Sequence, residues 1–330
     1  MKHSNKLAAL SVAAAALAST ASCQRSDYRH AEGMVWHTAY HVTYESSRDL
    51  TDSIISVFNE VGSSLNVFDP NSLASVVNRR DSVEVDRHFR EVYDMSVKVN
   101  RLTSGAFDPT LGPLITAWGF GKGHKASSDT LRLDSLLALT GVARTRIHDG
   151  VLIKSDARMQ FNFSAIAKGY GADCVAEMLA RNGSANYLVE IGGEIRCGGR
   201  NESGGYWRVS VDRPSYSDDA SHESQCVVSV TGCGLATSGN YRNFHVEGGS
   251  RYGHTISSRT GRPVQTDVIS ATVIAQTCME ADALSTSMMA MGSEKSKGLA
   301  ARLRYPTLLV LSDLTTWESP EFREKCTFKQ

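Results

Sequence analysis

Apolar residues recur at helical spacing in several parts of the chain. Between residues 48 and 66, roughly one face of a helix collects Leu50, Ile54, Ile55, Phe58, Val61 and Leu65. This spacing predicts an amphipathic helix that turns its apolar face inward. The same reasoning predicts further helices over residues 86–102, 164–181, 282–291 and 295–303.

Short runs rich in β-branched residues predict strands. They lie at residues 41–44, 186–191, 206–211, 226–230, 268–275 and 307–311. Gly-rich turns separate most of the runs that follow residue 183, and turns of that kind are typical of antiparallel connections. Helices and strands do not alternate steadily, so the sequence favours an α+β fold over a doubly wound parallel sheet. We expect a single domain over residues 34–330.

The first residues have the pattern of an export signal. Lys2 and Lys6 precede an apolar stretch at residues 7–19, which is too short to span a bilayer because a spanning helix needs ~20 residues. Thr20-Ala21-Ser22 before Cys23 resembles a lipoprotein cleavage site. We therefore expect a signal peptide at 1–22, a lipidated Cys23 and a polar tether at 23–33. Ordinary signal cleavage with an incidental Cys23 is the alternative.

Composition narrows the possible partners. The 330 residues carry 35 basic and 35 acidic side chains, a formal net charge of zero, whereas a nucleic-acid groove usually needs a basic excess. Seven cysteines are too few for a disulfide scaffold, and they show neither a CxxC motif nor a His partner at metal spacing. A disulfide is compatible with an exported protein, but the sequence cannot pair the thiols.

Two segments combine glycine, proline or other small residues with one charged side chain. Asp108 lies between Phe107 and Pro109 in a Gly-rich stretch at 103–121, where a carboxylate either binds a ligand or caps a turn. Lys168 lies at the start of the helix predicted over 164–181. Backbone N–H groups and the helix dipole favour phosphate there, and a lysine adds positive charge. A solvated surface lysine is the alternative.

Three further segments carry candidate chemistry. Gly192-Gly193 lets a flat ligand or a pyrophosphate touch the main chain, or forms a plain hairpin turn. His254 precedes a Ser/Thr/Gly turn and is a candidate general base near neutral pH. Asp282 and Thr286 are spaced i, i+4 on a predicted helix, so their oxygens share a face. Such hard oxygens suit Mg²⁺. A helix cap at Asp282 and a packed Thr286 are the alternative.

Several of these segments occur together as motifs. They read GAFDPTLGPL, WGFG, AIAKGYGAD, VEIGGEIRCGG, ATSGNY and ADALSTSMMAMG. In this order the motifs resemble the ApbE family, the FAD:protein FMN transferases, over about residues 34–312. The resemblance implies an FAD cleft between two lobes.

The resemblance also implies an activity. Members of the family bind FAD and Mg²⁺, and they transfer the FMN half of FAD onto a Thr hydroxyl of a target protein with release of AMP. Their usual targets are membrane-bound respiratory flavoprotein subunits of the Nqr or Rnf type. Two alternatives remain open: an FAD pyrophosphatase that gives FMN and AMP, and a non-catalytic FAD-binding carrier. An exported protein of this kind faces the periplasm and is held at the membrane by its N-terminal lipid.

By this resemblance, individual residues receive roles. Asp282, Thr286 and the main-chain carbonyl of Ala165 correspond to metal ligands, and His254 corresponds to the base that helps to deprotonate the acceptor Thr. Asp108 is a second candidate for that base. The expected cofactor-binding residues are Thr38, Ala106, Phe107, Asp108, Asn162, Lys168, Gly192, Gly193, Thr237, Ser238 and Thr255.

Three positions depart from the family pattern. Asn162 stands where the family usually has Asp, and Ser257 stands at the Asp of a His-Ile-Ile-Asp-Pro motif. Trp36-His37-Thr38 aligns with an early Met-Gly-Thr, so only Thr38 is kept. None of these changes affects Asp282 or Thr286. They bear on the balance between transfer and hydrolysis and not on the expected metal binding.

Overall fold

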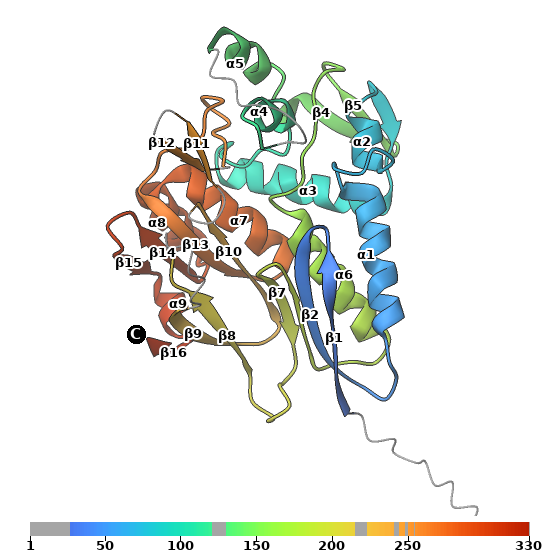
Figure 1. Ribbon diagram of the computed structural model, residues 1–330, viewed down its shortest axis with the longest axis vertical. Coiled ribbons are helices and arrows are strands. Elements are labelled where there is room, and N and C mark those ends of the chain that lie inside the picture. Colours follow the sequence, from blue (N-terminus) through green and yellow to red (C-terminus); the bar gives the residue numbers. More distant parts are fainter. Residues whose placement is uncertain are drawn as a thin grey trace, which may run out of the picture.

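The computed structural model describes residues 27–120, 130–214, 223–240, 244–247, 250–253 and 255–329. Its largest element is an eight-stranded antiparallel sheet of order β1-β2-β6-β7-β10-β13-β14-β15 (Figure 1). The strands are β1 (Asp27–Val35), β2 (Thr38–Ser46), β6 (Tyr187–Ile191), β7 (Glu194–Gly198), β10 (Cys233–Gly239), β13 (Val268–Ala275), β14 (Thr307–Leu311) and β15 (Thr316–Glu318).

Helices cover one face of this sheet. Helix α6 (Ala167–Arg181) packs on β6 and β7, and α7 (Cys278–Met291) packs on β10 and β13. Helices α1 (Thr51–Leu65) and α3 (Arg87–Leu102) pack against these two in turn. Their apolar faces form the main core. Ile54, Phe58, Val61 and Leu65 of α1 are buried there as expected, whereas Ile55 points away from it and is 42% exposed.

A smaller sheet covers the other face. It has the order β16-β9-β8, with β8 (Trp207–Asp212), β9 (Ser224–Val230) and β16 (Cys326–Lys329). Side chains such as Trp207 and Val228 pack there against Ile195 and Leu235 of the large sheet. Because β13 lies between two covering layers, all eight of its residues are buried.

The remaining described elements surround this core. They are α2 (Leu73–Val77), β3 (Ser82–Glu84), α4 (Gly112–Ala117), α5 (Thr130–Leu137), the 3₁₀ turn η1 (Val142–Arg144), β4 (Thr145–His148), β5 (Val151–Lys154), β11 (Phe244–Glu247), β12 (Ser250–Gly253), α8 (Ser293–Leu303) and α9 (Pro320–Arg323). Within the described part of the chain, no helix is both long and apolar enough to cross a membrane.

The α+β prediction with largely antiparallel strands is confirmed. The strand predicted over 268–275 is β13, and the strand predicted over 307–311 is β14. The expected tether is wrong for residues 27–33, which form most of strand β1. All nine residues of β1 pair with β2. The signal peptide and Cys23 lie outside the described residues.

Helices α6 and α7 approach closely at Gly169. A Cβ atom there would lie 2.4 Å from the carbonyl oxygen of Cys278 and 2.8 Å from Cβ of Asp282. Asp173 of α6 also accepts hydrogen bonds from the backbone N–H groups of Cys278 (2.9 Å) and Met279 (2.8 Å). A helix start needs such acceptors because its first N–H groups have no partner within the helix.

We expect Gly169→Ala to lower the free energy of unfolding by about 2 kcal/mol, because backbone must move to admit the methyl group. Gly298→Ala in α8 is the matched control. Nothing lies within 4 Å of a Cβ at that position, so it should raise stability by about 0.5 kcal/mol. Urea unfolding of both variants measures the difference. Equal stability of the two variants would contradict the close packing of α6 on α7.

Candidate functional site

A cleft of about 720 Å³ opens where the helical layer meets the ends of β7 and β10. Its walls come from the β1–β2 turn, α1, the segments at 106–111 and 162–168, the β6–β7 turn and α7. Twelve of the side chains or main-chain positions expected to bind cofactor or metal line it together. They are Ala106, Phe107, Asp108, Asn162, Ala165, Lys168, Gly192, Thr237, Ser238, Thr255, Asp282 and Thr286.

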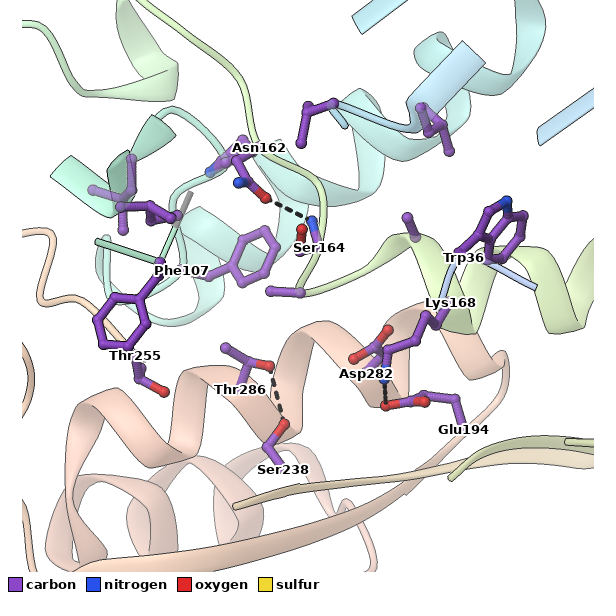
Figure 2. Close-up of a pocket in the computed structure, with 18 of the residues that line it drawn as sticks. Trp36, Phe107, Asn162, Ser164, Lys168, Glu194, Ser238, Thr255, Asp282 and Thr286 are labelled. Carbon is purple, nitrogen blue, oxygen red and sulfur yellow. Dashed lines mark hydrogen bonds and ion pairs between the residues drawn. The ribbon is translucent and has the colours of Figure 1, made fainter. Parts of the chain in front are cut away.

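Helix α7 presents Asp282 and Thr286 to the cleft on one face (Figure 2). Asp282 is 3% exposed. The Thr286 hydroxyl lies 3.0 Å from Oγ of Ser238 on β10, which also lies 2.9 Å from Oγ of Ser285. Ser238 therefore fixes the side chain of Thr286.

The segment that leads into α6 adds backbone groups. The N–H of Gly169 donates to Oδ2 of Asp282 over 3.1 Å instead of to the carbonyl of Ala165. Among the described residues, no backbone group outside the regular elements donates to that carbonyl. Ala165 itself lines the cleft, as does Asp282.

These oxygens fit a hard divalent cation. One carboxylate, one hydroxyl and one main-chain carbonyl are the donor types that Mg²⁺ takes when it keeps water or phosphate oxygens as its other ligands. Asp282, Thr286 and Ala165 supply this set from α7 and the start of α6. In the described part of the chain, no three His, Cys, Asp or Glu side chains gather in a way that could hold a metal by themselves.

Lys168 forms an ion pair that the sequence did not reveal. Its Nζ lies 2.6 Å from Oε1 of Glu194, which is 4% exposed. The other oxygen of Glu194 is buried and has no hydrogen-bond partner among the described residues. Lys168, for which a solvated surface position was the alternative, is therefore a charge at the cleft wall, held by a carboxylate from the first residue of β7 (Figure 2).

Burial dominates the electrostatics of this group. Desolvation raises the pKa of Glu194 to about 8, with Asp282 adding to the rise and Lys168 opposing it. Desolvation also raises the pKa of Asp282, against Lys168 and the Gly169 N–H. Burial works to lower the pKa of Lys168, but Glu194 and Asp282 outweigh it, so its pKa is raised. The cleft thus holds two buried acids and one cation, an arrangement that a bound divalent cation would complete.

Glu194 should make stability depend on pH in the ligand-free protein. Its folded pKa of about 8 exceeds the unfolded value near 4.5, so its stabilising contribution is present at low pH and is lost as the pH rises toward 8. Relative to Glu194→Gln, wild-type stability should fall between pH 5 and pH 8 by on the order of 3 kcal/mol. Urea unfolding of both proteins across this range measures it, and parallel pH profiles would contradict it.

The opposite part of the cleft is mostly apolar. Phe68, Phe107, Ile115, Phe120 and Ile256 line it. The segment at 106–111 supplies Phe107, α4 supplies Ile115, and Phe120 follows α4. A cleft with a charged end and an apolar, aromatic end suits a ligand that joins a phosphate group to a flat ring system.

Asp108 and Asn162 shape the cleft wall by local hydrogen bonds. Oδ1 of Asp108 accepts from the N–H and the hydroxyl of Thr110, and Oδ2 accepts from the N–H of Val142. Oδ1 of Asn162 accepts from the N–H of Ser164 over 2.9 Å. Both carboxylate oxygens of Asp108 are therefore engaged, and its role as a proton acceptor stays a prediction.

The glycine pair forms the β6–β7 turn. Gly192 and Gly193 have φ values of 59° and 99°, which favour glycine and make a tight hairpin possible. Gly192 lines the cleft and Gly193 does not. A Cβ at Gly192 would lie 2.5 Å from Oγ1 of Thr38, so Thr38 lies behind the turn and outside the lining.

Trp36 and His37 also line the cleft. They stand where the family has Met-Gly, so the resemblance gave them no role. They form the β1–β2 turn with φ values of 47° and 65°, an uncommon conformation for residues with a side chain. The Trp36 ring packs edge-on against Phe58. A Cβ at Gly62 or at Gly171 would come within 3 Å of the ring. The absence of side chains on α1 and α6 at these points therefore makes room for it.

The segment after β12 is described only from Thr255 onward. The buried hydroxyl of Thr255 donates to Oδ1 of Asn240 over 3.2 Å, and Ser257 accepts from the N–H groups of Arg259 and Thr260. His254 lies outside the described residues, so its part as a base stays a prediction.

Comparison with known proteins shows which family this chain is similar to. The model of the ApbE family matches residues 36–309. The chain is 35% identical to the FAD:protein FMN transferase of Vibrio cholerae serotype O1, covering 91% of this chain and 92% of that protein. It is 31% identical to the FAD:protein FMN transferase of Escherichia coli K12, covering 84% and 79%.

Solved structures agree. The flavin transferase ApbE from Vibrio cholerae superposes with a TM-score of 0.82 at 32% identity, over 91% of this chain and 99% of that one. The apo form of the Pseudomonas stutzeri flavinyl transferase ApbE gives a TM-score of 0.82 at 30% identity, over 91% and 97%. The chain therefore belongs to the ApbE family.

Proposed function

We propose that this protein is a Mg²⁺-dependent FAD:protein FMN transferase. In this reaction the hydroxyl oxygen of an acceptor Thr attacks the FMN phosphorus of FAD, the bond from that phosphorus to the bridging oxygen breaks, and AMP leaves. The observation that carries the proposal is the juxtaposition in one cleft of Asp282, Thr286, Ala165 and the Lys168–Glu194 pair. The relatives named as transferases support it.

Each residue of the charged end has a part in this reaction. Asp282, Thr286 and Ala165 would hold Mg²⁺, which neutralises phosphoryl oxygens when bound. Lys168 adds a positive charge next to the same oxygens, and Glu194 fixes its direction by the 2.6 Å contact. His254 would take the proton of the acceptor hydroxyl. The apolar end, with Phe107 and Phe120 among its lining, would receive the flavin ring.

We further propose that the protein works at the periplasmic face of a membrane, held by a lipid on Cys23. The support is the basic and apolar pattern of residues 1–22 and the small residues before Cys23. Its acceptor would be a respiratory flavoprotein subunit of the Nqr or Rnf type. Labelling with a radioactive fatty acid in cells tests the anchor, and a label that persists in Cys23→Ser would contradict it.

Incubation with FAD, Mg²⁺ and a purified acceptor subunit tests the activity. We expect a fluorescent band that survives denaturation, an acceptor mass increased by one FMN phosphoester on a Thr, and an equal amount of AMP. AMP and free FMN without any modified acceptor would instead assign the protein as an FAD pyrophosphatase. FAD binding without AMP would leave only a carrier.

A further inference from the structure

Two of the cysteines that the structure describes, both free thiols, lie directly opposite each other. Cys197 near the end of β7 and Cys233 at the start of β10 are register partners in adjacent antiparallel strands. Both side chains point into the core between the large sheet and the β16-β9-β8 sheet. They are 36 residues apart in sequence, and Sγ of Cys197 lies 3.8 Å from the carbonyl oxygen of Cys233.

This register satisfies the geometry of a disulfide. Directly opposed residues of an antiparallel pair have Cα atoms about 4.5–5.5 Å apart, within the range of about 4.4–6.8 Å that a disulfide bridges. Because both side chains lie in the same core, the two sulfurs are on the same face of adjacent strands. We propose that Cys197 and Cys233 form an intrachain disulfide when the protein meets a disulfide oxidant.

The surroundings of the two sulfurs indicate which one reacts with the oxidant first. Cys233 is 9% exposed and Cys197 is 1% exposed, so the oxidant reaches Cys233 first. A hydrogen bond from the Cys197 thiol lowers the pKa of Cys233, and the same contact raises the pKa of Cys197. A thiolate at Cys233 attacks one sulfur of the oxidant and releases the other as a thiol. Cys197 then displaces the second oxidant sulfur. Two protons and two electrons pass to the oxidant, which is reduced to two thiols.

The bond would fix two strands that carry site residues. β7 begins with Glu194, and β10 carries Thr237 and Ser238 at its other end. Next to Cys233, Gly234 lies against the first turn of α7, where a Cβ would be 2.2 Å from the N atom of Cys278. The disulfide would therefore join β7 to the strand on which the start of α7 rests, below the charged end of the cleft.

Peptide mapping of the full chain tests the pairing. The protein is treated with oxidised glutathione or with dithiothreitol, denatured, alkylated and digested. We expect oxidised protein to give one cross-linked peptide pair that contains Cys197 and Cys233 and lacks two hydrogens. Alkylation of both thiols after oxidation, or a bond from either of them to another cysteine, would overturn the proposal.

Thermal unfolding supplies a second measurement. Closing a loop of this length should raise Tm by about 5 °C in the oxidised wild type over the reduced one. Cys197→Ala and Cys233→Ala should lose this redox-dependent rise, whereas Cys174→Ala, which removes a buried thiol on α6, should keep it. A rise that persists in Cys197→Ala would contradict the pairing. These measurements read the thiols and not FMN transfer, so they are independent of the proposed function.

Discussion

Replacing Asp282 by Asn should reduce FMN transfer by at least about 100-fold, because it removes the only carboxylate of the proposed Mg²⁺ set and with it the charge that holds the cation. The variant should nevertheless fold. Burial already raises the pKa of Asp282, so the site accepts a neutral group in the absence of metal, and the amide oxygen can still accept from the N–H of Gly169.

Binding of the cation can be measured apart from catalysis. Mg²⁺ should raise Tm of the wild type and not that of Asp282→Asn, because a cation that binds only the folded state stabilises it by mass action. Ser287→Ala is the matched control on the same helix, since that hydroxyl donates to the carbonyl of Ala283 and does not line the cleft. Normal transfer and a normal Mg²⁺ response in Asp282→Asn would refute the metal assignment.

Replacing Lys168 by Met should lower the free energy of unfolding above about pH 8 by about 3 kcal/mol, because Glu194 is ionised there and loses its buried partner. Adding Glu194→Gln should restore most of that stability, since no uncompensated charge then remains. FMN transfer should stay low in the double variant, because the positive charge beside the phosphates is still missing.

Urea unfolding of the two single variants and the double variant, with transfer rates for each, separates the two roles. A double variant as unstable as Lys168→Met would mean that packing of the lysine stem, and not the ion pair, stabilises the fold. Recovery of transfer together with stability would show that Lys168 only balances Glu194 and has no part at the phosphates.

The sequence predicted best the elements whose pattern is local. The apolar face of α1 and the continuous β-branched run of β13 depend on residues close in sequence, and both were found where expected. Strand β1 was missed because it lies at the sheet edge and most of its residues are at least partly exposed. Its polar sequence resembles a linker, and only its pairing with β2 makes it a strand.

The site shows the same division. Asp282 and Thr286 could be placed together because i, i+4 spacing on one helix needs no tertiary knowledge. The sequence pattern does not single out Glu194, because its partner Lys168 precedes it by a whole helix and a strand. Trp36 was missed for a similar reason, because the space for its ring comes from Gly62 and Gly171 on two separate helices.

Strand β1 sets the separation between the cleft and whatever precedes Asp27. Its nine residues end at Val35, and Trp36 of the cleft wall follows directly. At about 3.4 Å per residue, such a strand is about 30 Å long. Its pairing with β2 keeps it extended. With the proposed lipid at Cys23, β1 would hold the cleft away from the lipid-anchored end of the chain, by a distance close to the thickness of a bilayer core. The acceptor threonines that can reach the cleft would then be those on segments of the target protein that extend well beyond the lipid headgroups.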